Sequence, residues 1–143
     1  LAVERHAVPL VRALIAVSPQ RWAGASCCVA LQGRVALGDD AGERFGCQLV
    51  VVLIGERPGL SSTDSLGAYL TFAPRVGRTD AVRNCVSNIR PEGLGYEAAA
   101  RRIDWIAAAG EARGVTGVGL KDESEGAVLR APQLSVGEVA QYT

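Results

Sequence analysis

Apolar residues recur at helical spacing in two long segments of the chain. One segment spans residues 3–17 and the other residues 96–112, and in each the apolar positions gather on one side of a helix of 3.6 residues per turn. These positions are Ala7, Leu10, Val11, Leu14 and Ile15 in the first segment and Ala99, Ile103, Ile106, Ala107 and Gly110 in the second. The pattern predicts two amphipathic helices, the second with a solvated charged face. A shorter helix is expected at residues 39–45.

Four short segments have the composition of β-strands and are bounded by turn residues. They are residues 27–31 (CCVAL), 48–54 (QLVVVLI), 68–72 (AYLTF) and 84–89 (NCVSNI). In residues 48–54 every side chain after Gln48 is apolar, which is typical of a central parallel strand buried on both faces. Alternation of helices and strands with short connections predicts an α/β fold: a three-layer open sheet, mostly parallel, flanked by helices.

The length and composition favour one packed domain. The 143 residues fall within the roughly 100–200 expected of a single domain, and 48% of them are hydrophobic against 21% charged. Residues 1–120 are assigned to this domain. Residues 121–143 begin with the charged turn KDESEG, carry only weakly apolar stretches, and are expected to form a C-terminal arm or a peripheral element.

Charge and cysteine content indicate which partners and which cellular compartment to expect. Fifteen basic residues balance fifteen acidic ones, so no field that would attract nucleic acid or an anionic membrane is expected. The longest apolar run is too short to span a bilayer, and no export signal is recognised, which favours a cytoplasmic protein. The four cysteines form no C-x-x-C pair and are expected to be reduced, while His6 is expected to be solvated or packed rather than a metal ligand.

Three loops are candidates for a ligand site. In an open parallel sheet ligands bind at the carboxyl ends of the strands, and residues 33–35, 55–59 and 85–88 lie at such ends. Phosphate-binding glycine motifs are missing, and so are Ser/His/Asp and Cys/His combinations. A nucleotide-binding domain is therefore disfavoured, and the chemistry is expected to depend on a partner.

Strings in and after these loops resemble the small subunit (light chain) of ethanolamine ammonia-lyase. The strings are GERPGLSS at 55–62, DSLGAY at 64–69, YLTFAPRVG at 69–77, TD at 79–80 and RNCVSNIRPEG at 83–93. The resemblance covers residues 1–120 and implies a Rossmann-like sheet. Members of that family have a longer N-terminal portion, with a further helical segment and strand.

The resemblance implies a subunit of an adenosylcobalamin-dependent ammonia-lyase. In that family the corrinoid lies between the small subunit and a large barrel subunit, and the large subunit holds the substrate. The enzyme converts ethanolamine to acetaldehyde and ammonia by radical chemistry that the cofactor supplies. The resemblance also implies a hetero-oligomer, no activity of this chain alone, and a location in a bacterial microcompartment.

The family's corrinoid-binding positions correspond to Val35, Glu56 and Cys85, one in each of the three loops. A carboxylate acceptor at Glu56, with backbone groups at the other two positions, suits the amide side chains of a corrin rim. The D-x-H-x-x-G string that supplies a cobalt-ligating histidine is missing, so a base-on cofactor is implied. The alternative hypothesis is a non-catalytic α/β protein-interaction module in which the same loops form a docking surface. In that case Glu56 is a solvated turn carboxylate, and Val35 and Cys85 are packing residues.

Overall fold

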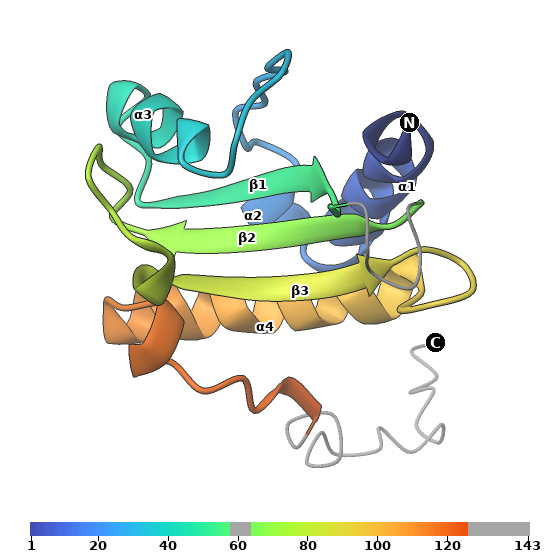
Figure 1. Ribbon diagram of the computed structural model, residues 1–143. Helices are drawn as coiled ribbons and strands as arrows, with labels where there is room; N and C mark the ends of the chain where they lie inside the picture. Colours follow the sequence, from blue (N-terminus) through green and yellow to red (C-terminus); the bar gives the residue numbers. More distant parts are fainter. Residues whose placement is uncertain (58–63, 126–143) are drawn as a thin grey trace, which may run out of the picture.

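The computed structural model describes residues 1–57 and 64–125 of the chain (Figure 1). In order, the elements are helices α1 (Ala2–Val17), α2 (Pro19–Trp22) and α3 (Leu37–Arg44), strands β1 (Leu49–Gly55) and β2 (Leu66–Phe72), the 3-10 turn η1 (Asp80–Val82), strand β3 (Arg83–Ile89), helix α4 (Tyr96–Arg113) and the 3-10 turn η2 (Gly117–Gly119). The predicted helices at residues 3–17, 39–45 and 96–112 are confirmed, as are the strands at 48–54, 68–72 and 84–89. None of the helices within the described residues combines the length and apolar character that crossing a bilayer requires.

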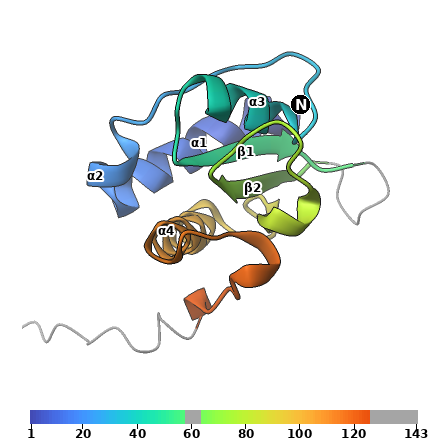
Figure 2. The ribbon, with the colours of Figure 1, turned by 90° about the vertical axis from the view of Figure 1, so that its left-hand side faces the viewer.

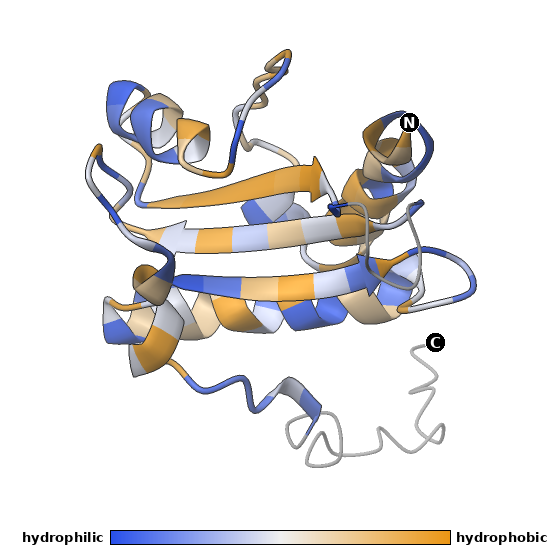
Figure 3. Ribbon diagram, viewed as in Figure 1, coloured by the Kyte–Doolittle hydropathy of each residue, from blue (hydrophilic) through white to orange (hydrophobic). Residues whose placement is uncertain are grey.

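The three strands form an antiparallel sheet in the order β1-β2-β3. The prediction of a mostly parallel, Rossmann-like sheet is therefore wrong for the described residues. Strand β1 is apolar along nearly its whole length (Figure 3), yet it pairs antiparallel with β2, from Leu49 opposite Phe72 to Gly55 opposite Leu66. Its composition reflects helices on both faces of the sheet rather than the direction of its neighbour. Leu49 faces α4 near Gly110, whereas Val50 and Val52 face α3.

The predicted strand at residues 27–31 is also wrong. This segment has no helical or strand assignment, and Val29 and Leu31 are 85% and 89% exposed. An apolar, partly β-branched run favours a strand locally. It becomes a strand only when it pairs with a neighbouring strand, and no described residue pairs with this run. Strand β1 is consequently an edge strand of the described sheet, not its centre.

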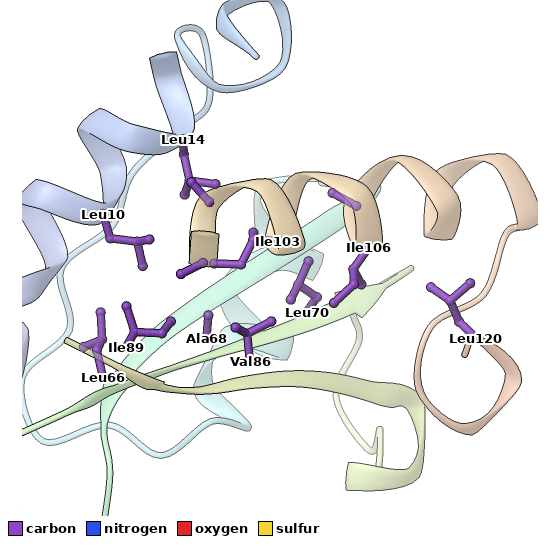
Figure 4. Close-up of a cluster of buried hydrophobic side chains, with 13 residues drawn as sticks. Leu10, Leu14, Leu66, Ala68, Leu70, Val86, Ile89, Ile103, Ile106 and Leu120 are labelled. Carbon is purple, nitrogen blue, oxygen red and sulfur yellow. The ribbon is translucent and has the colours of Figure 1, made fainter. Parts of the chain in front are cut away.

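The hydrophobic core lies between one face of the sheet and helices α1 and α4 (Figure 4). The predicted stripe of α4 is confirmed, since all five of its positions are buried. Helix α1 buries Leu10 and Leu14, while Val11 and Ile15 remain partly exposed. Figure 2 shows α3 and α4 on different sides of the strands. The three-layer arrangement of helix, sheet and helix is thus present even though the pairing is antiparallel.

The charged residues of α4 are less solvated than predicted. Asp104 accepts hydrogen bonds from Arg21 Nη1 (2.8 Å) and from Trp22 Nε1 (2.9 Å), and Glu111 accepts one from Arg21 Nη2 (3.1 Å). These contacts fasten the short helix α2 to α4. The prediction of a solvated charged face is therefore wrong for Asp104, which is partly buried, whereas Glu111 is exposed.

Residues after α4 return to the sheet. Gly114 ends the helix in the left-handed conformation (φ 68°), which glycine adopts without steric cost. Thr116 donates to the Val82 carbonyl (2.6 Å), and Leu120 is buried in the core. Residues 121–125 continue beside α4, where Asp122 pairs with Arg102. The rest of the predicted C-terminal arm, residues 126–143, lies outside the described residues.

Candidate functional site

Helix α3 covers part of the face of the sheet opposite the core. Alternation along the strands places Val52, Tyr69 and Cys85 side by side on this face, because Tyr69 is paired with both of the others. Helix α3 packs over the β1 side, where a Cβ at Gly38 would meet Val52 Cγ2 at 2.2 Å. Cys85 is exposed and Tyr69 is half-buried. We call Tyr69 and Cys85, with Glu56 at their rim and buried Gly67 between Tyr69 and Glu56, the open patch.

Glu56 joins the ends of all three strands at one edge of the open patch. Its backbone N–H, just past β1, donates to the Ser65 carbonyl at 3.0 Å. Its carboxylate accepts a hydrogen bond from the Ser65 hydroxyl and one from the Asn88 N–H at 3.1 Å. Asn88 has a positive φ of 57°, a conformation that asparagine tolerates better than most residues. A carboxylate has about four lone-pair positions, so half-buried Glu56 keeps acceptor capacity toward solvent.

Tyr69 and Cys85 interact through their side chains on neighbouring strands. Tyr69 is paired with Cys85 across β2 and β3, and its hydroxyl acts on the Cys85 thiol as a hydrogen-bond donor that lowers the pKa of the thiol. Desolvation by surrounding side chains raises the pKa of Cys85, the negative charge of Glu56 raises it further, and the hydrogen bond from Tyr69 opposes the rise. Desolvation also raises the pKa of Tyr69. Both groups are therefore held in their neutral forms at neutral pH.

Val35 has a separate position at the start of α3. Its carbonyl oxygen accepts a hydrogen bond from the Gly38 N–H at 3.0 Å, in the turn that leads into the helix. Helix α3 is fixed over the same face as the open patch by a buried ion pair between Asp39 and Arg83. The structure thus groups Glu56 and Cys85 around Tyr69 and ties Val35 to the helix on the same side of the sheet. An open hollow of about 500 Å³ beside Val35 is lined by Gln32, Gly33, Arg34, Ala36, Leu37, Asp39, Asp40, Val76, Gly77 and Arg78.

The prediction that all three candidate loops follow the carboxyl ends of parallel strands is wrong. Residues 33–35 do not follow a strand, and Cys85 lies within β3 rather than in a loop after it. Strands β1 and β3 nevertheless run in the same direction, because each is antiparallel to β2. Glu56 and Asn88 consequently meet at one edge of the sheet. Of the predicted GERPGL loop, residues 58–63 lie outside the described residues.

Tyr69 is not among the predicted site residues, although the sequence pattern around it indicates which face of the sheet it occupies. In AYLTF, the alternation of buried Ala68 and Leu70 with Tyr69 points the tyrosine to the opposite face. Pairing with Cys85 requires the register of β2 and β3, which the sequence does not display.

His6 is occupied by structural contacts, as its interpretation as a packed residue predicted. Its Nδ1 lies 2.7 Å from the Tyr96 hydroxyl and its Nε2 lies 3.2 Å from Asp64, and the residue is buried. Within the described ranges, His, Cys, Asp and Glu form no group of three that could hold a metal ion.

Asp64 precedes β2 and binds α1, so we expect it to stabilise the fold at neutral pH. The hydrogen bond from Arg5 (2.5 Å) lowers the pKa of Asp64, and the contact with His6 lowers it further. A lowered pKa in the folded state contributes stability above the unfolded pKa, and this is lost as pH falls through the folded pKa. Asp64→Asn should therefore reduce the free energy of unfolding at pH 7, and the difference from the unsubstituted protein should vanish in acid. Urea denaturation at both pH values measures this, and a difference that persists in acid would contradict it.

The comparisons with known proteins agree on one family. A family model described as Ethanolamine ammonia-lyase light chain (EutC) matches residues 1–121. Similar curated proteins include the ethanolamine ammonia-lyase small subunit of Ralstonia nicotianae, 54% identical over 132 residues that make up 92% of this chain and 49% of the relative. That of Azotobacter vinelandii is 54% identical over 130 residues, 90% of this chain and 48% of the relative. That of Xanthomonas campestris pv. campestris is 51% identical over 130 residues, with the same two shares.

The chain spans about half the length of these curated relatives. The match runs through α1 to η2 and includes every residue of the open patch. The resemblance noted in the sequence is therefore confirmed, and the chain belongs to the family of ethanolamine ammonia-lyase light chains.

Proposed function

We propose that this chain is part of the small subunit of an adenosylcobalamin-dependent ethanolamine ammonia-lyase. In this proposal it encloses the corrinoid against a large subunit, and the enzyme converts ethanolamine to acetaldehyde and ammonia. The observation that supports it best is the grouping of Glu56 with Cys85 around Tyr69 on one sheet face, because the family resemblance implies corrinoid binding at both positions. The chain forms a hetero-oligomer, is inactive alone, and is cytoplasmic, within a bacterial microcompartment.

The residues of the open patch fit one face of a corrinoid. Tyr69 and Glu56 pack close over buried Gly67, where a Cβ would lie 3.2 Å from Tyr69 Cε2 and 3.7 Å from Glu56 Cγ, so their side chains form the surface at this point. Glu56 keeps lone pairs that can accept from the amide groups of a corrin rim. His6, the single histidine of the chain, is enclosed between Tyr96 and Asp64. The base-on cofactor that the family resemblance implies would need no histidine from this chain.

The role of this chain is to bind and orient. When bound, adenosylcobalamin supplies the radical chemistry, and the large subunit holds ethanolamine. Glu56 would accept hydrogen bonds from the rim, and Cys85 would present a neutral thiol beside it, because desolvation by neighbouring side chains and the charge of Glu56 both raise the pKa of the thiol. Val35 contributes from the β1 side, at the start of α3. None of these residues has a catalytic role in the proposal.

Retention of cofactor separates this function from the alternative of a non-catalytic interaction module. The protein that carries this chain is purified with and without an ethanolamine ammonia-lyase large subunit, incubated with adenosylcobalamin, and passed over a desalting column. The expected result is a visible corrinoid spectrum that elutes with the two-subunit complex. Assembly of the two subunits without bound corrinoid would favour the interaction module. A rise in melting temperature on addition of a nucleotide would instead favour a nucleotide-binding domain.

Glu56→Gln should weaken corrinoid binding by the assembled complex about tenfold. The substitution keeps the size of the side chain but exchanges a charged acceptor for a neutral amide, and hydrogen bonds to charged groups are worth about 1–2 kcal/mol more than neutral ones. The measurement is a titration with adenosylcobalamin followed by absorbance.

Glu97→Gln is the matched control, because it makes the same exchange on an exposed part of α4. Equal affinity of the Glu56→Gln and Glu97→Gln complexes would remove Glu56 from the corrinoid site. The melting temperatures of both variants show whether loss of the Glu56 carboxylate, which contacts Ser65 and Asn88, also lowers the stability of the fold.

A further inference from the structure

Tyr69 occupies the centre of the open patch. In the register of the sheet it lies between Val52 of β1 and Cys85 of β3. Its ring and the side chain of Glu56 both lie close to Gly67, since a Cβ there would be 3.2 Å from Tyr69 Cε2 and 3.7 Å from Glu56 Cγ. Tyr69 therefore connects Glu56 and Cys85, the two cofactor-binding candidates that the structure groups together.

The hydroxyl of Tyr69 gives the Cys85 thiol a defined direction. A thiol on an exposed strand position rotates about its Cα–Cβ bond, and a hydrogen bond to the sulfur favours one rotamer. The tyrosine ring has only two side-chain torsions and is half-buried, so its hydroxyl is held by packing. After donating to sulfur, the hydroxyl oxygen still has lone pairs that can accept a hydrogen bond from a ligand amide.

We propose that Tyr69 is a positioning residue for the corrinoid, which orients the Cys85 thiol and forms the surface between Cys85 and Glu56 on which the cofactor rests. This inference rests on the proposed function and names a residue that the family pattern did not supply. Tyr69 touches no reacting group in this role. It acts by pre-ordering the patch, which lowers the entropy lost on binding.

Tyr69→Phe tests the inference because it removes the hydroxyl and keeps the ring. Two results are expected. First, the pKa of the Cys85 thiol rises further, since the hydrogen bond that lowers it is lost. Second, adenosylcobalamin binds the two-subunit complex about fivefold more weakly, which corresponds to ~1 kcal/mol for one hydrogen bond. The thiol pKa is read from the pH dependence of iodoacetamide alkylation, with the peptide containing Cys85 followed by mass spectrometry.

Tyr96→Phe is the matched control. It removes a tyrosine hydroxyl that binds His6 at the start of α4, away from the open patch. This variant should leave the Cys85 pKa and the corrinoid affinity unchanged. A general loss of stability would affect both variants, whereas a positioning role affects only Tyr69→Phe.

The outcomes distinguish the inference from the proposed function. If the unsubstituted complex retains corrinoid but Tyr69→Phe binds it as tightly as Tyr96→Phe does, the inference is wrong and the proposed function stands. An unchanged Cys85 pKa in Tyr69→Phe also overturns it. If the unsubstituted complex retains no corrinoid, the proposed function fails and the inference fails with it.

Discussion

Replacing Arg83 by methionine should lower the free energy of unfolding by about 3–5 kcal/mol, because it leaves the carboxylate of Asp39 buried without its counter-ion. Both side chains are only 3% exposed, and Arg83 Nη2 lies 2.5 Å from Asp39 Oδ2. Arg83 also donates to the Thr79 carbonyl at 2.8 Å through Nη1. Chemical denaturation followed by circular dichroism measures the change.

A matched control exists on the same helix. Arg44 pairs with Asp40 at 2.9 Å, but these side chains are 77% and 42% exposed. Exposed pairs contribute about 0–1 kcal/mol, so Arg44→Met should have little effect. The double variant Asp39→Leu with Arg83→Met should recover part of the loss, because it removes both buried charges. A loss for Arg83→Met no larger than that for Arg44→Met would show that the pair does not hold α3 on the sheet.

The same ion pair fixes the site as well as the fold. Helix α3 begins two residues after Val35, and Asp39 lies in its first turn. Strand β3 carries both Arg83 and Cys85. Loss of the pair should therefore loosen α3, and with it Val35 in the turn before the helix, relative to Cys85 on β3.

Ile103→Ala should destabilise the protein by about 2–5 kcal/mol, the range for truncating a fully buried aliphatic side chain. Ile103 has no exposed surface and points from α4 into the cluster shared with α1 and the sheet (Figure 4). The cavity left behind is enclosed by rigid elements, so relaxation recovers little of the lost packing. Thermal or urea denaturation reports the change.

Val118→Ala is the comparison for this prediction. Val118 is 89% exposed, so its truncation should change the free energy of unfolding by less than ~0.5 kcal/mol. If Ile103→Ala were as mild as Val118→Ala, the core between α4 and the sheet would not be the source of stability.

Local pattern predicted the helices and most of the strands, whereas pairing required the structure. The stripe of α4 identified its buried residues because 3.6-residue periodicity records which side meets the core. An apolar run such as residues 49–54 records apolar contacts on both faces, which α3 provides on one face and α1 and α4 on the other. The predicted full burial is wrong, since every residue of β1 is only partly buried. The run does not record the direction of the neighbouring strand. For the same reason the run at residues 27–31 predicted a strand that the structure does not contain.

The candidate site was predictable only in part. The family strings supplied Val35, Glu56 and Cys85, but not the contacts that connect them. Glu56 reaches Asn88 because β1 and β3 run in the same direction on either side of β2, a fact of topology. Tyr69 reaches Cys85 only in the observed register of β2 and β3. A shift of one residue would turn Tyr69 toward the core.

The central claim is that the open patch faces the corrinoid, and protection of Cys85 from alkylation tests it most directly. The two-subunit complex is treated with iodoacetamide with and without adenosylcobalamin, and the peptides are quantified by mass spectrometry. Cys27 and Cys28 are exposed and lie outside the open patch, so they serve as internal references. The account predicts that the cofactor slows alkylation of Cys85 at least severalfold and leaves the two references unchanged. Equal alkylation of Cys85 in complexes that retain the cofactor and in those without it would contradict the account.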